Sequence, residues 1–159
     1  MSFRSEKKIR INSSKIFDLR KWIDENEGFQ LYHNRLINSI YFDTHNYSMY
    51  SDSMEGVLPR KKIRLRNYGK KFNFDDNIKK EIKISSVEGR FKTSLPEKNP
   101  LIAMKQGYLD KDYGLCNPVI NIIYERAYYK VKNIRLTLDQ KISYKRIVNV
   151  KISNFTTND

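Results

Sequence analysis

Apolar and polar side chains alternate through most of this 159-residue chain, as they do in β-strands, where successive side chains point to opposite faces. In residues 3–11, for example, Lys8 and Arg10 fall on the face opposite Ile9. The predicted strands cover residues 3–11, 36–44, 60–68, 79–85, 90–94, 119–131, 133–139 and 142–147. We therefore expect a mostly antiparallel sheet whose strands are joined by short polar turns.

Helical spacing is confined to a few short segments. Residues 14–26 place Ile16, Leu19 and Ile23 on one helical face. Residues 45–55 indicate a short helix or irregular segment, and residues 101–107 a short helix. No repeat or Gly/Ser linker divides the chain, so the predicted fold is a single α+β domain over residues 1–159, mostly β with a few peripheral helices.

Several predicted strands carry a charged face opposite a clean apolar face. On residues 60–68 the charged face holds Arg60, Lys62, Arg64 and Arg66; elsewhere it holds Glu81, Lys83, Arg126, Arg135 and Asp139. If the apolar faces pack outward against the helices, a closed sheet encloses a lumen lined mainly with Lys and Arg. Such a lumen favours bound phosphates, which Arg grips with two hydrogen bonds, and its carboxylates favour a divalent metal.

Composition narrows the class of protein. The chain has 31 Lys and Arg against 18 Asp and Glu, a net charge of +13, which favours nucleic acid, an anionic membrane surface or a phosphate-rich small molecule as partner. Its 39% of hydrophobic residues excludes a disordered chain, and the single Cys116 excludes a disulfide framework. No apolar run approaches the roughly 20 residues of a membrane span, and the start carries no apolar signal segment, so we expect a soluble, cytoplasmic protein.

Six segments in a fixed order resemble a known family. They are Glu6-x-Lys8, Ser39-Ile40-Tyr41-Phe42-Asp43-Thr44, Lys62-Ile63-Arg64-Leu65-Arg66-Asn67-Tyr68-Gly69, Glu81-Ile82-Lys83, Tyr124-x-Arg126 and Ile134-Arg135-Leu136-Thr137-Leu138-Asp139. Together they resemble the VTC (vacuolar transporter chaperone) domain, a polyphosphate polymerase module of the CYTH-like triphosphate tunnel superfamily. The resemblance spans nearly the whole chain.

The resemblance implies an eight-stranded antiparallel tunnel that binds ATP and polyphosphate and uses a divalent metal, manganese or magnesium. By position, the residues that act on the transferred phosphoryl group would be Arg64, Arg66, Arg126 and Arg135, and further phosphate ligands would be Lys8, Lys62, Lys83 and Lys92. Glu6 and Glu81 would hold the metal. Tyr41, Tyr68 and Tyr124 are the tyrosines placed to reach phosphate, and Asp139 is either a ligand or the ion-pair partner of a neighbouring Arg.

One departure from the family concerns the end of the chain. The family continues to a final Glu-x-Lys strand and a closing helix, whereas residues 149–159 of this chain predict a loop. We therefore expect the last strand and helix to be missing, and whether a partner chain completes the tunnel stays open. Three functions stay open: a polyphosphate polymerase, a metal-dependent triphosphatase with water as acceptor, and a non-catalytic module that binds polyphosphate or nucleic acid.

Overall fold

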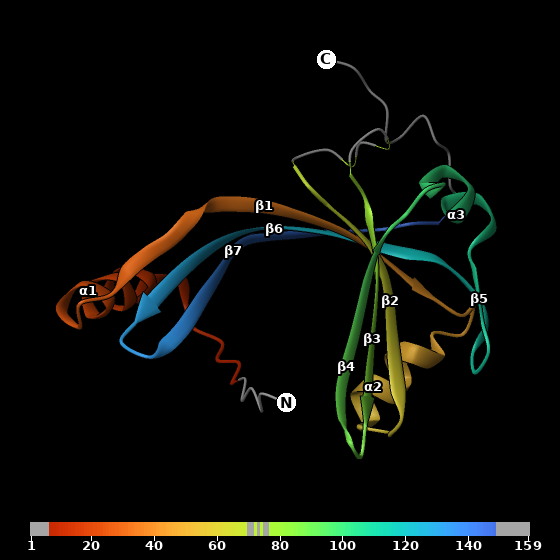
Figure 1. The fold of residues 1–159 in the computed structure, drawn as a ribbon, viewed down its shortest axis with the longest axis horizontal. Helices are drawn as coiled ribbons and strands as arrows, with labels where there is room; N and C mark the ends of the chain where they lie inside the picture. Colours follow the sequence, from red (N-terminus) through yellow and green to blue (C-terminus); the bar gives the residue numbers. More distant parts are fainter. Residues whose placement is uncertain (1–6, 70–71, 73, 75–76, 149–159) are drawn as a thin grey trace. The chain divides into compact units, whose positions relative to one another are not determined.

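Strands make up most of the fold in a computed structural model that describes residues 7–69, 72, 74 and 77–148 (Figure 1). A 3-10 turn, η1 (Ser13–Lys15), precedes the first of three described helices, α1 (Ile16–Glu25), α2 (Ser48–Glu55) and α3 (Pro100–Gln106). The strands are β1 (Phe29–Asp43), β2 (Arg60–Tyr68), β3 (Lys79–Ser86), β4 (Gly89–Pro96), β5 (Tyr108–Asp110), β6 (Gly114–Val131) and β7 (Ile134–Arg146). None of these helices is long and apolar enough to cross a membrane.

The described strands form one sheet in the order β4-β3-β2-β1-β6-β5, and β7 also pairs with β6. The pairs β1–β2, β2–β3, β3–β4 and β5–β6 are antiparallel. Because β2, β3 and β4 follow one another in the chain, they lie side by side as a meander (Figure 1). This arrangement confirms the predicted mostly antiparallel fold with peripheral helices.

The chain divides into two compact units. The first contains Met1–His33 and Ala127–Leu138, and the second contains Asn34–Arg126 and Asp139–Asp159. In the first unit Ile23 of α1 is buried, and the rings of Tyr32 and Tyr128 meet edge to face with their centroids 5.7 Å apart. The second unit holds the larger core and most of the predicted site.

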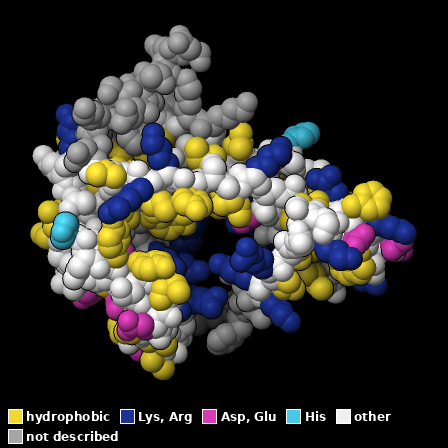
Figure 2. Space-filling model, turned by 180° about the vertical axis from the view of Figure 1, so that it is seen from behind, with side chains coloured by type: hydrophobic (Ala, Val, Ile, Leu, Met, Phe, Trp, Pro, Cys, Tyr) yellow, Lys and Arg dark blue, Asp and Glu magenta, His cyan; other side chains and the backbone are white. Residues whose placement is uncertain are grey.

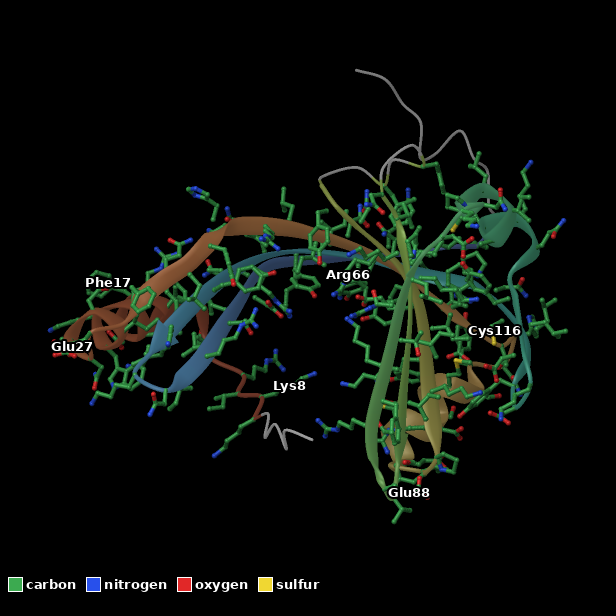
Figure 3. All side chains as sticks on the ribbon, in the orientation of Figure 1. Lys8, Phe17, Glu27, Arg66, Glu88 and Cys116 are labelled. Carbon is green, nitrogen blue, oxygen red and sulfur yellow. The ribbon has the colours of Figure 1, made fainter. Side chains whose placement is uncertain are left out.

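The core of the second unit lies between the strands and two helices. Its buried members are Ile40 and Phe42 of β1, Ile63 and Leu65 of β2, Met49 of α2, Ala103 and Met104 of α3, and Phe72, Ile78 and Cys116. Burying one such Leu or Ile side chain contributes about 1.5–3 kcal/mol. Because side chains alternate along a strand, Arg64 and Arg66 must lie on the opposite face from Ile63 and Leu65. Figure 3 shows Cys116 and Arg66 on opposite sides of β2, β3 and β4.

Asp43 fixes α2 to the end of β1. Its buried carboxylate accepts hydrogen bonds from the backbone N–H groups of Thr44, Met49 and Tyr50 at 2.7–2.9 Å. A carboxylate at a helix N-terminus satisfies otherwise unpaired donors and favours the helix dipole. The Asp of the Tyr-Phe-Asp-Thr motif therefore orients the helix that covers the core.

The prediction of a strand over residues 3–11 is wrong for its described part. Residues 7–12 belong to no strand, and all of them are exposed, with Ile9 at 72%. Lys7 occupies the face that the prediction assigned to Ile9 and Ile11, so this segment has no continuous apolar face to bury. Without ladder hydrogen bonds or burial, alternation alone does not stabilise a strand.

Several other boundaries differ from the predictions, including that of β6, which begins five residues before the predicted strand 119–131. β1 begins seven residues before the predicted strand 36–44, and β5 was not predicted. The predicted strands 133–139 and 142–147 form the single strand β7, in which Lys141 has a positive φ of 52°. A residue with positive φ locally disturbs the alternation of side chains between the two faces of a strand. The sequence of this one strand therefore shows two separate alternating segments. The predicted loop 149–159 lies outside the described residues.

Candidate anion-binding site

One face of the β2–β3–β4 meander carries a dense array of cations. It holds Arg60, Lys62, Arg64 and Arg66 of β2, Lys79, Glu81 and Lys83 of β3, and Arg90 and Lys92 of β4. Lys62 pairs with Lys83, and Lys83 pairs with Lys92 on the next strand. Like charges opposite each other destabilise a sheet, so this row favours an anionic ligand. Figure 2 shows Lys and Arg side chains clustered on a flank of these strands.

Arg64 is held by contacts on both neighbouring strands. Its Nε and Nη2 lie 2.7 and 2.6 Å from Oε2 of Glu81, and its Nη1 donates to the Tyr41 hydroxyl at 2.8 Å. The register explains the arrangement, because Arg64 pairs with Tyr41 on one side and with Glu81 on the other. These contacts orient the guanidinium in advance, which reduces the entropy lost when an anion binds.

Arg66 is the more buried arginine, with 8% of its side chain exposed. Its Nε donates to the Ser39 hydroxyl at 3.3 Å, and its Nη2 donates to the Tyr124 hydroxyl at 3.4 Å. The nearest oxygen of Glu81 lies 3.5 Å from Nη1. Hydroxyl groups orient a cation without neutralising it, so Arg66 shares the single negative charge of Glu81 with Arg64.

Glu81 is a buried carboxylate at the centre of three cations. Besides the two arginines, Nζ of Lys92 lies 2.7 Å from its Oε1. Burial raises the pKa of Glu81, but the hydrogen bond from Lys92 and the charges of Arg64 and Arg66 outweigh it, so that the pKa lies below its usual value. Glu81 is therefore ionised at neutral pH, and Arg64, Arg66 and Lys92 together exceed it by two positive charges.

Arg126 lies on β6 and forms a two-pronged ion pair with β7. Its Nε and Nη2 lie 2.5 and 2.7 Å from the two oxygens of Asp139, which confirms the ion-pair alternative for that residue. The guanidinium carbon of Arg126 is 5.2 Å from the centre of the Tyr124 ring. Since the Tyr124 hydroxyl also accepts from Arg66, this ring lies between the two arginines. Burial raises the pKa of Tyr124 more than the arginines lower it, so its hydroxyl stays protonated.

Lys8 and Arg135 belong to the first unit, whereas the residues above belong to the second. Lys8 is exposed, and the guanidinium carbon of Arg135 lies 5.8 Å from the centre of the Tyr128 ring. The structure therefore brings together Arg64, Arg66, Lys92 and Glu81, with Lys62 and Lys83 beside them on the same face. The predicted roles of Lys8 and Arg135 as phosphate-binding residues stay predictions.

Carboxylates in the described part of the chain do not fit a resident divalent metal. No three His, Cys, Asp or Glu side chains there are grouped so that they could hold an ion. Divalent cations take several oxygen ligands, but both oxygens of Glu81 already contact cations that would repel a metal. The predicted metal role of Glu81 is therefore not supported by its surroundings. Glu6, the other predicted metal ligand, lies outside the described residues.

Ser39 is a site residue that the sequence did not reveal, whereas Tyr41 and Tyr124 were expected to reach phosphate. Ser39 pairs with Arg66 across β1 and β2, two positions before Tyr41 on the same face. The shared alternation of Ser39 and Tyr41 is the signal that could have identified it. Tyr68 instead lies with its ring centre 5.9 Å from the guanidinium carbon of Arg35.

Comparison with known proteins bears on the family and the fold of this chain. Residues 3–113 match the model of the VTC domain family. Among solved structures, the fold resembles a Bacillus halodurans protein titled a "putative adenylate cyclase", with a TM-score of 0.56 and 11% identity over 91% of this chain and 80% of that one. At this identity the likeness shows a common fold alone. A search of the curated proteins gives no match.

Proposed function

This chain belongs to the VTC domain family, and from this premise we propose that it transfers the terminal phosphoryl group of ATP to a polyphosphate chain. A terminal oxygen of the polyphosphate attacks the γ-phosphorus, and the bond from that phosphorus to the β–γ bridging oxygen breaks. ADP leaves, and the polyphosphate grows by one phosphate.

The observation that carries the proposal is the cluster of Arg64, Arg66 and Lys92 around a single carboxylate. Phosphoryl transfer needs positioning of the reactants and neutralisation of charge more than covalent help from the protein. Two guanidiniums held by hydroxyl and carboxylate contacts supply both, because their remaining N–H donors match the geometry of phosphate oxygens. The low exposure of Arg66 strengthens its electrostatic effect.

The remaining predicted residues take roles that follow from their places. Lys62 and Lys83 would bind further phosphates along the row on β2 and β3. Lys8 and Arg135, which belong to the first unit, stay predicted phosphate ligands. Arg126 would act on the transferred group only after giving up part of its contact with Asp139. A divalent cation, manganese or magnesium, would enter as part of the ATP substrate complex.

The test is to incubate the purified chain with ATP, with and without manganese, and to resolve the products as polyphosphate, free phosphate or unchanged ATP. Arg64→Ala and Arg66→Ala should each abolish polyphosphate synthesis. Arg20→Ala is the matched control, since Arg20 is an exposed arginine on α1 and its loss removes the same charge.

Each outcome has a separate meaning. Polyphosphate that disappears in both site variants and persists in Arg20→Ala supports the proposed polymerase. Free phosphate without polyphosphate would replace it with a triphosphatase that uses water as acceptor. Tight binding of polyphosphate or nucleic acid without any turnover would replace it with a binding module.

A further inference from the structure

Glu81 is the one acidic side chain on the cation-bearing face of β2, β3 and β4 within the described residues. We infer that Glu81 is a built-in counter-anion that makes this site select chains of several phosphates over a single phosphate. The inference rests on the proposed function and adds a specificity role to a residue that the sequence had assigned to metal binding.

Contacts at Glu81 place its negative charge where a single phosphate would bind. A phosphate held by Arg64 and Arg66 must approach guanidiniums that both already contact Oε2 of Glu81, at 2.6–2.7 and 3.5 Å. Because Glu81 is buried and ionised, its repulsion of the incoming anion is not relieved by water. The carboxylate therefore weakens the binding of any ligand whose charge is confined to this point.

A chain of phosphates can place most of its charge elsewhere. Lys83 is two residues from Glu81 on the same strand, about 7 Å along it at the usual rise per residue, and Lys62 is its cross-strand partner. Phosphates that reach these lysines gain attraction at a distance where the repulsion from Glu81 is smaller. The repulsion from Glu81 therefore acts on nearly all of the charge of a single phosphate. In a polyphosphate chain it acts strongly on only one of several phosphates.

Binding of orthophosphate and tripolyphosphate to the full chain tests this inference, with both ligands titrated at the same pH and salt. Glu81→Gln removes the charge and keeps the size of the side chain. We expect it to tighten orthophosphate binding about tenfold and tripolyphosphate binding less than about threefold, so that the selectivity ratio falls. Glu81→Asp keeps the charge and should leave the ratio within about twofold of the wild type.

Glu88→Gln is the matched control, because Glu88 lies at the turn between β3 and β4 and loses the same charge away from the cluster (Figure 3). It should leave both affinities nearly unchanged. The ratio of two dissociation constants from one preparation does not depend on the folded fraction, so it stays valid if Glu81→Gln lowers stability. A larger rise in Tm with orthophosphate in Glu81→Gln than in the wild type would agree with the inference.

Two results would overturn the inference while leaving the proposed function intact. One is weaker binding of both ligands in Glu81→Gln, which would mean that Glu81 mainly positions the arginines. The other is equal tightening of both ligands, which would mean that its charge acts without selectivity. Failure of the wild type to bind tripolyphosphate, or binding unaffected by Arg64→Ala, would overturn the proposed function and this inference together.

Discussion

Replacing Lys61 with Met should destabilise the second unit, because it leaves a largely buried carboxylate without its cation. Lys61 lies on β2 between the site residues Arg60 and Lys62 but points to the other face, where 11% of its side chain is exposed. Its Nζ lies 3.0 Å from both oxygens of Asp110 on β5, whose side chain is 10% exposed, and also contacts Asp112. This ion pair connects β2 to β5, which are not neighbours in the sheet.

Breaking a buried ion pair by removing one partner costs about 3–5 kcal/mol. Asp110 retains hydrogen bonds from the backbone N–H groups of Asp112 and Tyr113, at 2.9 and 3.3 Å, so we expect the lower end, about 3 kcal/mol. For a chain of this size that corresponds to a fall in Tm of roughly 6–12 °C. Urea unfolding of the wild type and of Lys61→Met at pH 7 measures the difference.

The double variant Lys61→Met/Asp110→Asn separates the unpaired charge from lost packing. If the unpaired carboxylate of Asp110 causes the loss of stability in Lys61→Met, the double variant should be more stable than Lys61→Met alone. A double variant as unstable as Lys61→Met, or a loss below about 1 kcal/mol in the single variant, would refute the reasoning.

The pH dependence follows from the directions of the two pKa shifts. Burial would raise the pKa of Asp110, but the backbone N–H groups and Lys61 outweigh it and lower the pKa, so its contribution is present above its unfolded pKa and is lost as pH falls through the folded value. Burial would lower the pKa of Lys61, but Asp112 and Asp110 raise it, so its contribution is lost only as pH rises through the folded value above 10.5. The difference in free energy of unfolding between the wild type and Lys61→Met should therefore become smaller as the pH falls into the acid range.

Three further predictions concern the site, the first unit and the core of the second unit. Tyr41→Phe removes the hydroxyl that lies 2.8 Å from Arg64 and should weaken tripolyphosphate binding about threefold to tenfold in a binding titration, whereas unchanged affinity would contradict a positioning role. Gly28→Ala would place a Cβ 2.5 Å from Cγ2 of Ile23, so it should cost about 1–3 kcal/mol in thermal unfolding; a neutral result would show that α1 shifts freely. Burial, followed by nearby carboxylates, raises the pKa of Cys116 to about 11, so the native thiol should react with a disulfide reagent at pH 8 far more slowly than the unfolded thiol, and rapid native labelling would contradict its burial.

The meander was the most predictable part of the fold. The predicted strands 60–68, 79–85 and 90–94 match β2, β3 and β4 within one or two residues, because strict alternation marks each strand. The beginning of β1 was missed because its polar residues, such as Gln30 and Asn34, hide the alternation. Residues 7–11 show the converse, since their alternation has no burial to accompany it.

The sequence assigned charged residues to faces, but it could not supply the pairing between strands. It placed Glu81 and Lys83 on one face, and a carboxylate among cations was then interpreted as a metal ligand. Only the register shows that Arg64 lies directly opposite Glu81, and only side-chain geometry shows that Lys92 reaches back to it. The role of Glu81 depends on these non-local contacts, which alternation along one strand does not encode.

The site cluster of Arg64, Glu81 and Lys92 also has a consequence for folding kinetics. All three residues come from one continuous meander, so we expect them to meet before the longer-range pairing of β1 with β6 forms. The row of Lys62, Lys83 and Lys92 must be brought together in the same early step, against its own repulsion. Added salt screens that repulsion, so it should speed the pairing of these strands. The same screening should weaken the binding of a polyanion to the folded site.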